Sequence, residues 1–174
     1  MKNISSIALL LSPAVCLQAH AEIYMTDTQA ASLLFPQEKL SRKQLELTQT
    51  EADSIEQSSG EKVRAKQLSL FESNVKGNLV FIDQVLGKHE FITYALGISN
   101  GKVAGIEIIE YRESYGQKVR EEEWRKQFVG KEKSAKFKLN EDIKNISGAT
   151  LSSAHVTAGV KRILHTYEKV RARI

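Results

Sequence analysis

The chain has 174 residues, of which 41% are hydrophobic and 26% charged, a composition typical of a globular domain with a buried core. The formal net charge of +4 is mixed along the sequence rather than gathered in a basic stripe, which argues against nucleic-acid binding. The one cysteine, Cys16, lies in a segment that we expect to be removed. The mature chain would then have no disulfide, no thiolate nucleophile, no iron–sulfur ligand and no C-x-x-C-H haem site, so any redox centre needs an organic cofactor or a histidine-bound metal.

The first 21 residues have the features of a secretory signal peptide. Lys2 gives a positively charged start, residues 7–17 form a short apolar run, and Ala19-His20-Ala21 matches the A-x-A pattern of a cleavage site. The apolar run is short for a bilayer span, and a retained N-terminal anchor is the alternative. We therefore expect cleavage near Ala21, a mature start at Glu22, and a periplasmic or otherwise exported protein.

The next section, residues 22–77, is predicted to be mainly helical. Apolar residues gather between residues 27 and 57 with a break at Pro36, and a polar stretch then closes the segment. We expect these helices to pack on one side of a sheet formed by the following section, residues 78–174. The two sections together are expected to form one compact unit.

Strand periodicity is clear from residue 78 onward. Residues 79–82 form a short apolar run, which is consistent with a buried strand. Residues 92–98 then alternate large apolar side chains with Thr, Ala and Gly, the period-two pattern of a strand with two different faces.

A hairpin is predicted to follow. Asn100-Gly101 lies between two apolar segments, and this pair favours a type I′ turn because both positions adopt positive φ. The returning strand, residues 103–111, is predicted to place Ala104, Ile106 and Ile108 on one face. Residues 78–111 should therefore form an antiparallel sheet of at least three strands.

The chain ends in a predicted amphipathic helix. Apolar residues recur there at steps of three and four, which places them on one face: Val156, Val160, Ile163, Tyr167 and Val170. The predicted fold class is α+β, an antiparallel sheet packed against helices.

A stretch of small residues precedes this helix: Ser147-Gly148-Ala149-Thr150-Leu151-Ser152-Ser153. Its serines and threonine are expected to cap free N–H groups of the helix start, and Gly148 allows a bend or a close approach to a ligand. A helix start also carries unpaired N–H groups and the positive end of the macrodipole. The stretch is therefore a candidate phosphate site.

The same residues resemble the flavinylation motif of the FMN-binding domain family, in which Ser-Gly-Ala-Thr is followed by an apolar residue and Ser. The family includes the G subunit of the Rnf electron-transport complex and the C subunit of the sodium-pumping NADH:quinone reductase. There, the threonine is joined by a phosphoester bond to the phosphate of FMN. The resemblance implies that Thr150 carries FMN covalently, with its neighbours in the cofactor site: Ser147, Gly148, Ala149, Leu151 and Ser152.

A second similarity lies upstream, where the family has a Gly-rich loop, a tryptophan, Gln-Phe and Gly-Lys in that order. Here these are residues 115–119, Trp124, Gln127-Phe128 and Gly130-Lys131. In the family the Gly-rich loop lies near the flavin, which implies that Ser114, Tyr115 and Gly116 line the pocket.

Two departures from the family pattern accompany this resemblance, which covers roughly residues 78–170. The family's Glu-Thr-Pro-Gly opening is absent, since this chain reads Tyr111-Arg112-Glu113-Ser114. In addition, Lys144 stands where the family often has Asp, three residues ahead of the motif's Ser, and the nearest acid is Asp142.

Other residues have two interpretations from the sequence. His89, beside Lys88, could donate a hydrogen bond to a flavin carbonyl or phosphate, or could be an ordinary residue at a strand edge. Trp124 and Phe128 are four residues apart on an expected helix, which favours core packing over stacking on a cofactor.

The sequence shows no acid–base pair, nucleophile–base pair or metal-ligand cluster, which favours a carrier over a stand-alone enzyme. On the resemblance, the protein is an exported flavoprotein that transfers electrons between redox partners. The implied partners are a membrane-bound flavo- or haem-protein and a flavin transferase that uses FAD and magnesium to install FMN. The alternatives are an FMN-dependent reductase of a small substrate, and a non-redox exported binding module whose loop caps a helix or holds an anion.

Overall fold

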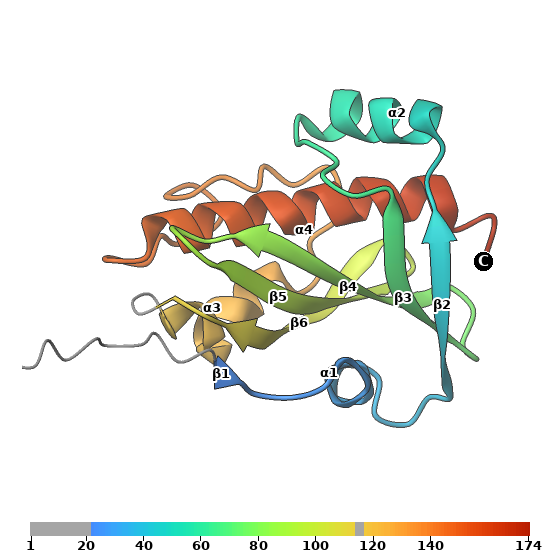
Figure 1. The fold of residues 1–174 in the computed structure, drawn as a ribbon, viewed down its shortest axis with the longest axis horizontal. Helices are drawn as coiled ribbons and strands as arrows, with labels where there is room; N and C mark the ends of the chain where they lie inside the picture. The colour runs from blue at the N-terminus through green and yellow to red at the C-terminus, as the bar shows by residue number, and fades with distance from the viewer. Residues whose placement is uncertain (1–21, 114–116) are drawn as a thin grey trace, which may run out of the picture.

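An antiparallel sheet forms the centre of the computed structural model, which describes residues 22–113 and 117–174 (Figure 1). Within these residues the sheet has six strands in the order β1-β6-β5-β4-β3-β2. The strands are β1 (Glu22–Ile23), β2 (Leu40–Glu46), β3 (Gln67–Ser73), β4 (Asn78–Leu86), β5 (Phe91–Ser99) and β6 (Lys102–Tyr111). The helices are α1 (Asp27–Leu34), α2 (Gln49–Ser59), α3 (Glu122–Arg125) and α4 (Thr150–Val170), with short 3-10 helices η1 (Gln117–Arg120) and η2 (Lys126–Phe128). The predicted α+β class is confirmed.

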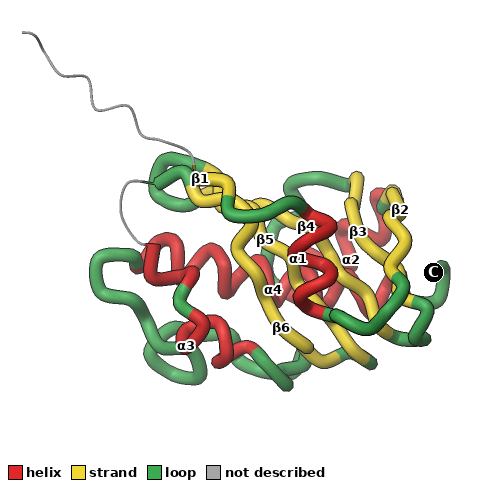
Figure 2. The backbone as a smooth tube through the Cα atoms, turned by 90° about the horizontal axis from the view of Figure 1, so that it is seen from below, coloured by secondary structure: helices red, strands yellow, loops and turns green. Residues whose placement is uncertain are grey.

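Helices cover both faces of the sheet. α4 and α2 lie on one side and α1 on the other (Figure 1; Figure 2). The alternation in β5 explains this, because Tyr94 and Leu96 join the larger apolar cluster with α4 while Ala95 joins the smaller cluster with α1. Small residues let α1 approach closely, since a Cβ atom at Gly105 would lie only 2.7 Å from Leu34 of that helix.

The β5–β6 hairpin confirms the predicted turn. The two strands pair in antiparallel fashion, and Ser99 and Lys102 form the last pair before a two-residue loop. Asn100 and Gly101 in this loop have φ values of 50° and 83°, the positive values that a type I′ turn requires.

One strand face was predicted wrongly. Ile106 and Ile108 face α4, whereas Ala104 packs with the cluster beneath α1 on the opposite face. The cause is a β-bulge, because the register of the ladder shifts between Gly97 and Ile98 of β5 and gives β6 one extra residue at this point.

The N-terminal section contains two long strands as well as two helices. Residues Leu40–Glu46 form β2, which pairs with β3 at the edge of the sheet, so the predicted helix through this segment was wrong. Most of β2 is exposed, and its polar sequence lacks the alternation that marks a half-buried strand. α1 and α2 lie on opposite faces of the sheet, which corrects the expectation that both pack on one side.

Capping boxes set where these two helices begin. Thr26 and Gln29 exchange side-chain and backbone hydrogen bonds at the start of α1, and Thr48 and Glu51 do the same at α2. β3 then pairs with β4, so the two predicted sections of the chain contribute to one continuous sheet.

The C-terminal helix α4 packs along the larger cluster. Its predicted apolar face is confirmed, since all its members are buried: Val156, Val160, Ile163, Tyr167 and Val170. Gly159 permits close packing on the sheet, because a Cβ atom there would lie 2.3 Å from the Tyr94 hydroxyl oxygen. That hydroxyl donates to Asp83, which also forms an ion pair with the buried Arg162 of α4.

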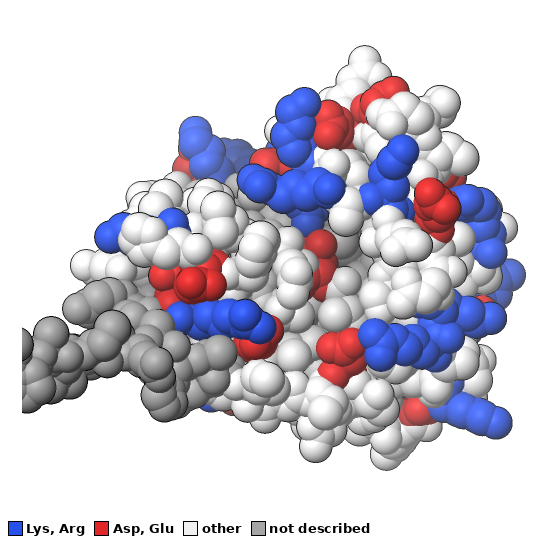
Figure 3. Space-filling view, in the orientation of Figure 1, with Lys and Arg blue, Asp and Glu red and all other residues white. Residues whose placement is uncertain are grey.

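Charged side chains of both signs are interspersed over the face seen in Figure 3. Many charged side chains of the described residues form ion pairs, as Arg42 does with Asp27 and Lys62 with Glu56. No helix in residues 22–113 or 117–174 combines the length and the apolar character needed to cross a membrane.

Candidate cofactor site

A pocket of about 390 Å³ lies at the start of α4, between this helix, the β4–β5 loop and the residues that follow β6. Six predicted site residues line it: His89, Gly148, Ala149, Thr150, Leu151 and Ser152. Lys88 and Glu113 complete the lining. Ser147 is exposed in the preceding turn and is not part of the lining, and the predicted Ser114-Tyr115-Gly116 lies outside the described residues.

A tight turn leads the chain into α4. The Ala149 N–H donates to the Ile146 carbonyl oxygen at 2.9 Å, and Gly148 has a φ of 80°, a left-handed value that favours glycine. Ala149 then occupies the N-cap position of α4, and no side-chain cap hydrogen bond forms there within the described part of the chain. The predicted capping by serines and threonine was therefore wrong, and the N–H groups of the first turn can face a ligand.

Thr150, the predicted attachment residue, is the first residue of α4 and is exposed. Its Oγ1 accepts a hydrogen bond from Asn145 Nδ2 at 3.2 Å, which leaves one lone pair and the hydroxyl proton for another partner. Ala149 before it is buried, and Leu151 after it is 48% exposed. The Thr150 hydroxyl is thus presented at the surface next to one small and one apolar residue.

Ser152 and Ser153, which follow Thr150 in α4, form hydrogen bonds within the protein. The buried Ser152 hydroxyl lies 3.2 Å from the Tyr111 hydroxyl at the end of β6, and Ser153 donates to the Ala149 carbonyl oxygen at 2.9 Å. Burial raises the pKa of Tyr111; the Ser152 hydrogen bond opposes this shift and the charge of Glu113 adds to it. Tyr111 is therefore a neutral phenol at physiological pH and ties α4 to β6.

Glu113 holds the β4–β5 loop against the pocket. Its carboxylate accepts the backbone N–H groups of His89 and Glu90. Burial raises the pKa of Glu113, but the backbone donors of His89, Glu90 and Lys88 outweigh it, so the net shift is downward and the carboxylate stays ionised. A Cβ atom at Gly87 would lie 2.6 Å from Glu113 Oε1, so only glycine lets the loop and the carboxylate approach this closely.

The residues of the second similarity to the family hold the backbone that leads to the motif. Trp124 Nε1 donates to the Lys144 carbonyl oxygen at 2.8 Å, and the Lys144 N–H donates to Gln127 Oε1 at 2.7 Å. Trp124 and Phe128 are buried and pack edge to face, with ring centroids 5.1 Å apart. Their expected place in the core is confirmed, and with Gln127 they fix the chain just before Asn145.

Asp142, the acid nearest the motif, is engaged in its own loop. Its carboxylate accepts the N–H groups of Phe137 at 3.1 Å and Lys138 at 2.8 Å, and the Lys131 ammonium at 3.1 Å. Burial raises the pKa of Asp142, but these donors together lower it by more than burial raises it. The net shift of the pKa is therefore downward. Asp142 therefore stabilises the loop that precedes the motif.

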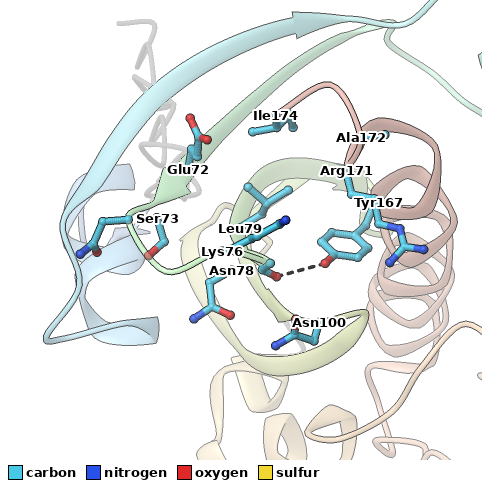
Figure 4. A pocket seen from close by; sticks show the side chains of 12 residues that line it. Glu72, Ser73, Lys76, Asn78, Leu79, Asn100, Tyr167, Arg171, Ala172 and Ile174 are labelled. Atoms are coloured by element: carbon cyan, nitrogen blue, oxygen red, sulfur yellow. Dashed lines mark hydrogen bonds between the residues drawn. The ribbon is translucent and has the colours of Figure 1, made fainter.

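A larger cavity lies elsewhere. It measures about 860 Å³ and lies where the β3–β4 turn and Asn100 meet the C-terminal end of α4 (Figure 4). Tyr167 forms one wall and donates to the Gly77 carbonyl oxygen at 3.1 Å, with Lys76 and Arg171 among the lining residues. α4 has 21 residues and is about 30 Å long, so this cavity is remote from Thr150. Cavity size alone would have misplaced the candidate site.

The donors of the smaller pocket suit a phosphate monoester. The positive end of α4 points at it, and the exposed Lys88 and His89 lie on its rim. The charge of Glu113 is directed to backbone N–H groups of the loop rather than left unpaired. The Thr150 hydroxyl supplies an alcohol where a phosphoester would form.

Sequence reasoning did not identify Glu113 or Asn145 as part of this site. Glu113 could have been found from the topology, because antiparallel pairing of β4, β5 and β6 places the β4–β5 loop beside the end of β6. Asn145 carries no such signal, since its contact with Thr150 depends on the turn at Gly148.

Similarity to known proteins agrees with this site. Residues 87–165 match the model of the FMN-binding domain family. Among solved structures, the chain is similar to the crystal structure of Shewanella oneidensis NqrC, at 12% sequence identity and a TM-score of 0.55, over 83% of this chain and 92% of that chain. At this identity the likeness shows the fold alone. No curated protein matches the sequence.

The family match contains the whole lining of the smaller pocket, from Lys88 to Ser152. It also contains the supporting residues Trp124 and Gln127. The resemblance predicted from the motif is therefore confirmed: residues 87–165 of this chain match the FMN-binding domain family across the entire candidate site.

Proposed function

We propose that this protein is an exported flavoprotein that carries FMN on Thr150 through a phosphoester bond and transfers electrons between redox partners. The observation that carries the proposal is the position of Thr150. Its hydroxyl is exposed at the first residue of α4, in a pocket with Lys88 and His89, and it belongs to a Ser-Gly-Ala-Thr motif inside an FMN-binding family match.

The local structure supports attachment by a transferase. Thr150 Oγ1 would form a bond to the phosphorus of the FMN half of FAD, the pyrophosphate bond would break, and AMP would leave with its phosphate. The hydroxyl proton would pass to a base of the transferase. Gly148 and Ala149 leave the hydroxyl accessible, and the remaining negative charge would gain about 0.3–1 kcal/mol from the helix dipole.

The bound flavin would supply the electron transfer, while the protein positions it and shields it. Lys88 and His89 would offer hydrogen bonds to the phosphate or to a flavin carbonyl. A covalent link would keep the cofactor from being lost outside the cytoplasm, in keeping with the signal peptide predicted at residues 1–21. The proposed partners are a membrane-bound flavo- or haem-protein and an FAD-dependent flavin transferase.

Intact mass of the denatured protein, purified after co-expression with a flavin transferase, tests this function. We expect a chain starting at Glu22 with one added FMN, localised to Thr150 by fragmentation. Thr150→Val should remove the modification. Thr50→Val, which changes another exposed threonine in the first turn of a helix, should leave it in place.

Other outcomes would point to the alternatives. Denaturant-resistant flavin in Thr150→Val would overturn the attachment residue. An unmodified chain that is yellow in the native state would indicate non-covalent FMN, and a colourless one would indicate a non-redox binding module. Turnover of a small substrate by the purified holoprotein without a partner would favour a reductase.

A further inference from the structure

We infer that Asn145 is the positioning residue for flavin attachment, holding the Thr150 hydroxyl in the orientation in which it accepts FMN. This inference rests on the proposed function. Asn145 lies five residues before Thr150, on the other side of the Gly148 turn, and its Nδ2 donates to Thr150 Oγ1 at 3.2 Å.

The backbone of Lys144, the residue before Asn145, is held by two hydrogen bonds. Trp124 Nε1 donates to the carbonyl oxygen of Lys144, and the N–H of Lys144 donates to Gln127 Oε1. Trp124 is 5% exposed and packs on Phe128, which is fully buried. The side chain of Asn145 therefore starts from a rigid point, and a rigid support is what makes a hydrogen bond to a reacting hydroxyl effective.

The side chain of Asn145 forms its hydrogen bond with Thr150. Its Oδ1 is buried and has no hydrogen-bond partner within the described residues. A buried carbonyl oxygen without a partner is unfavourable, and a residue that served only the loop would be expected to pair both ends of its amide. The end of this amide that is paired is the end on the Thr150 hydroxyl.

The direction of this hydrogen bond suits the reaction. Because Nδ2 donates, one lone pair of Oγ1 is occupied, while the other lone pair is free for the phosphorus and the hydroxyl proton is free for a base. After attachment Oγ1 has no proton, and it can only accept. The Asn145 amide can keep its hydrogen bond to the ester oxygen, whereas a carboxylate at this position could not.

Two substitutions at Asn145 distinguish its hydrogen bond to the free Thr150 hydroxyl from its hydrogen bond to the ester oxygen. Asn145→Leu removes the hydrogen bond and keeps a similar volume. Asn145→Asp keeps an acceptor for the free hydroxyl but has no donor for the ester, and it adds a negative charge beside the phosphate. Asn74→Asp is the matched control, because it adds the same charge far from Thr150 and keeps the acceptor that the Lys39 N–H uses at 2.8 Å.

The first measurement uses the full chain without flavin. Urea denaturation of the wild type, Asn145→Leu, Thr150→Val and the double variant forms a double-mutant cycle. If Asn145 and Thr150 interact as the structure shows, the two effects are not additive. Additive effects would overturn the inference, whether or not the protein accepts FMN.

The second measurement uses purified flavin transferase with FAD and magnesium, followed by intact mass over time. We expect the transfer rate at saturating acceptor protein to fall about five- to tenfold in Asn145→Leu, as for loss of one hydrogen bond, and further in Asn145→Asp. The KM for the acceptor should stay near the wild-type value, and Asn74→Asp should behave as wild type.

The outcomes distinguish this inference from the proposed function. A wild-type rate in Asn145→Leu, or an effect on KM alone, would overturn the positioning role and leave flavin attachment intact. A wild-type chain that accepts no flavin would overturn both the proposed function and the role of Asn145. Slow transfer with an unchanged KM in both Asn145 variants would support the inference.

Discussion

At the scale of single residues, Glu113 determines the shape of the candidate site. Its carboxylate accepts backbone N–H groups from the β4–β5 loop, and this loop carries Lys88 and His89 to the rim of the pocket. The same carboxylate occupies the space that a side chain at Gly87 would need. One acid therefore positions two basic residues without bonding to either side chain.

Glu113→Gln is predicted to loosen this loop, because the backbone N–H groups of His89 and Glu90 share one carboxylate oxygen, Oε1, and a neutral amide oxygen is a weaker acceptor than a carboxylate oxygen. We expect a loss of about 1 kcal/mol in the free energy of unfolding, a modest figure because the site is partly exposed to solvent. Urea denaturation at pH 7 measures this. Glu90→Gln removes one negative charge from the β4–β5 loop itself and should have a smaller effect.

The pH dependence of the stability of the wild type and of Glu113→Gln gives a second check. The pKa of Glu113 is lowered from its ordinary value of 4.5 in the folded protein, so its ionised form favours folding. This stabilisation is complete above pH 4.5 and is lost as the pH falls through the lowered pKa. The difference in stability between wild type and Glu113→Gln should therefore shrink on acidification below pH 4.5. A difference that stays constant would contradict the assigned role.

At the scale of elements, the packing of α4 on the sheet depends on one missing side chain. Gly159 lies against Tyr94 and Val85, and the Tyr94 hydroxyl there donates to Asp83. Burial and the nearby charge of Asp83 raise the pKa of Tyr94, so its hydroxyl keeps its proton. α4 carries Thr150 at its start, and the distance of this helix from the sheet sets where the attachment residue lies.

Gly159→Ala is predicted to destabilise the protein although alanine is the better helix former. The gain of about 1 kcal/mol in helix propensity is outweighed by overpacking, because the new Cβ atom would lie 2.3 Å from the Tyr94 hydroxyl oxygen and 2.9 Å from Val85. We expect a net loss of about 1–3 kcal/mol in the free energy of unfolding. In the Tyr94→Phe background the same substitution should be tolerated better, and an equal loss there would contradict this explanation.

The elements differ in how well the sequence predicts them, for physical reasons. β5 alternates because its two faces pack against different helices, and α4 has a regular apolar face because it lies along one sheet; both patterns are local. β2 is an edge strand with most of its side chains exposed, so no alternation marks it. The bulge at Ala104 depends on pairing with β5. The contact of Asn145 with Thr150 depends on the Gly148 turn. Neither feature leaves a periodic pattern in the sequence.

At the scale of the whole molecule, the N-terminal and C-terminal sections share one structure. β3 pairs with β4 across the predicted boundary at residues 77 and 78, and α2 packs against α4. β1 pairs with β6, so the start of the described chain lies beside the strand that leads to Glu113. The candidate site is thus built on a sheet to which both sections contribute.

We predict that the two sections unfold in one transition. Hydrogen exchange followed by mass spectrometry in increasing urea should give the same midpoint for peptides from β2 and β3 as for peptides from β5 and α4. Earlier loss of protection in residues 40–73 alone would show that the N-terminal section unfolds independently.

The support beneath the motif has a practical consequence. Trp124 is the only tryptophan of the chain, and its indole N–H is bonded to the backbone that leads into the Gly148 turn. Tryptophan fluorescence of this protein therefore comes from Trp124 alone and reports on the segment from Lys144 to the Gly148 turn. The ordering of this segment can be followed in unlabelled protein, in the same sample whose visible absorbance shows whether a flavin is bound.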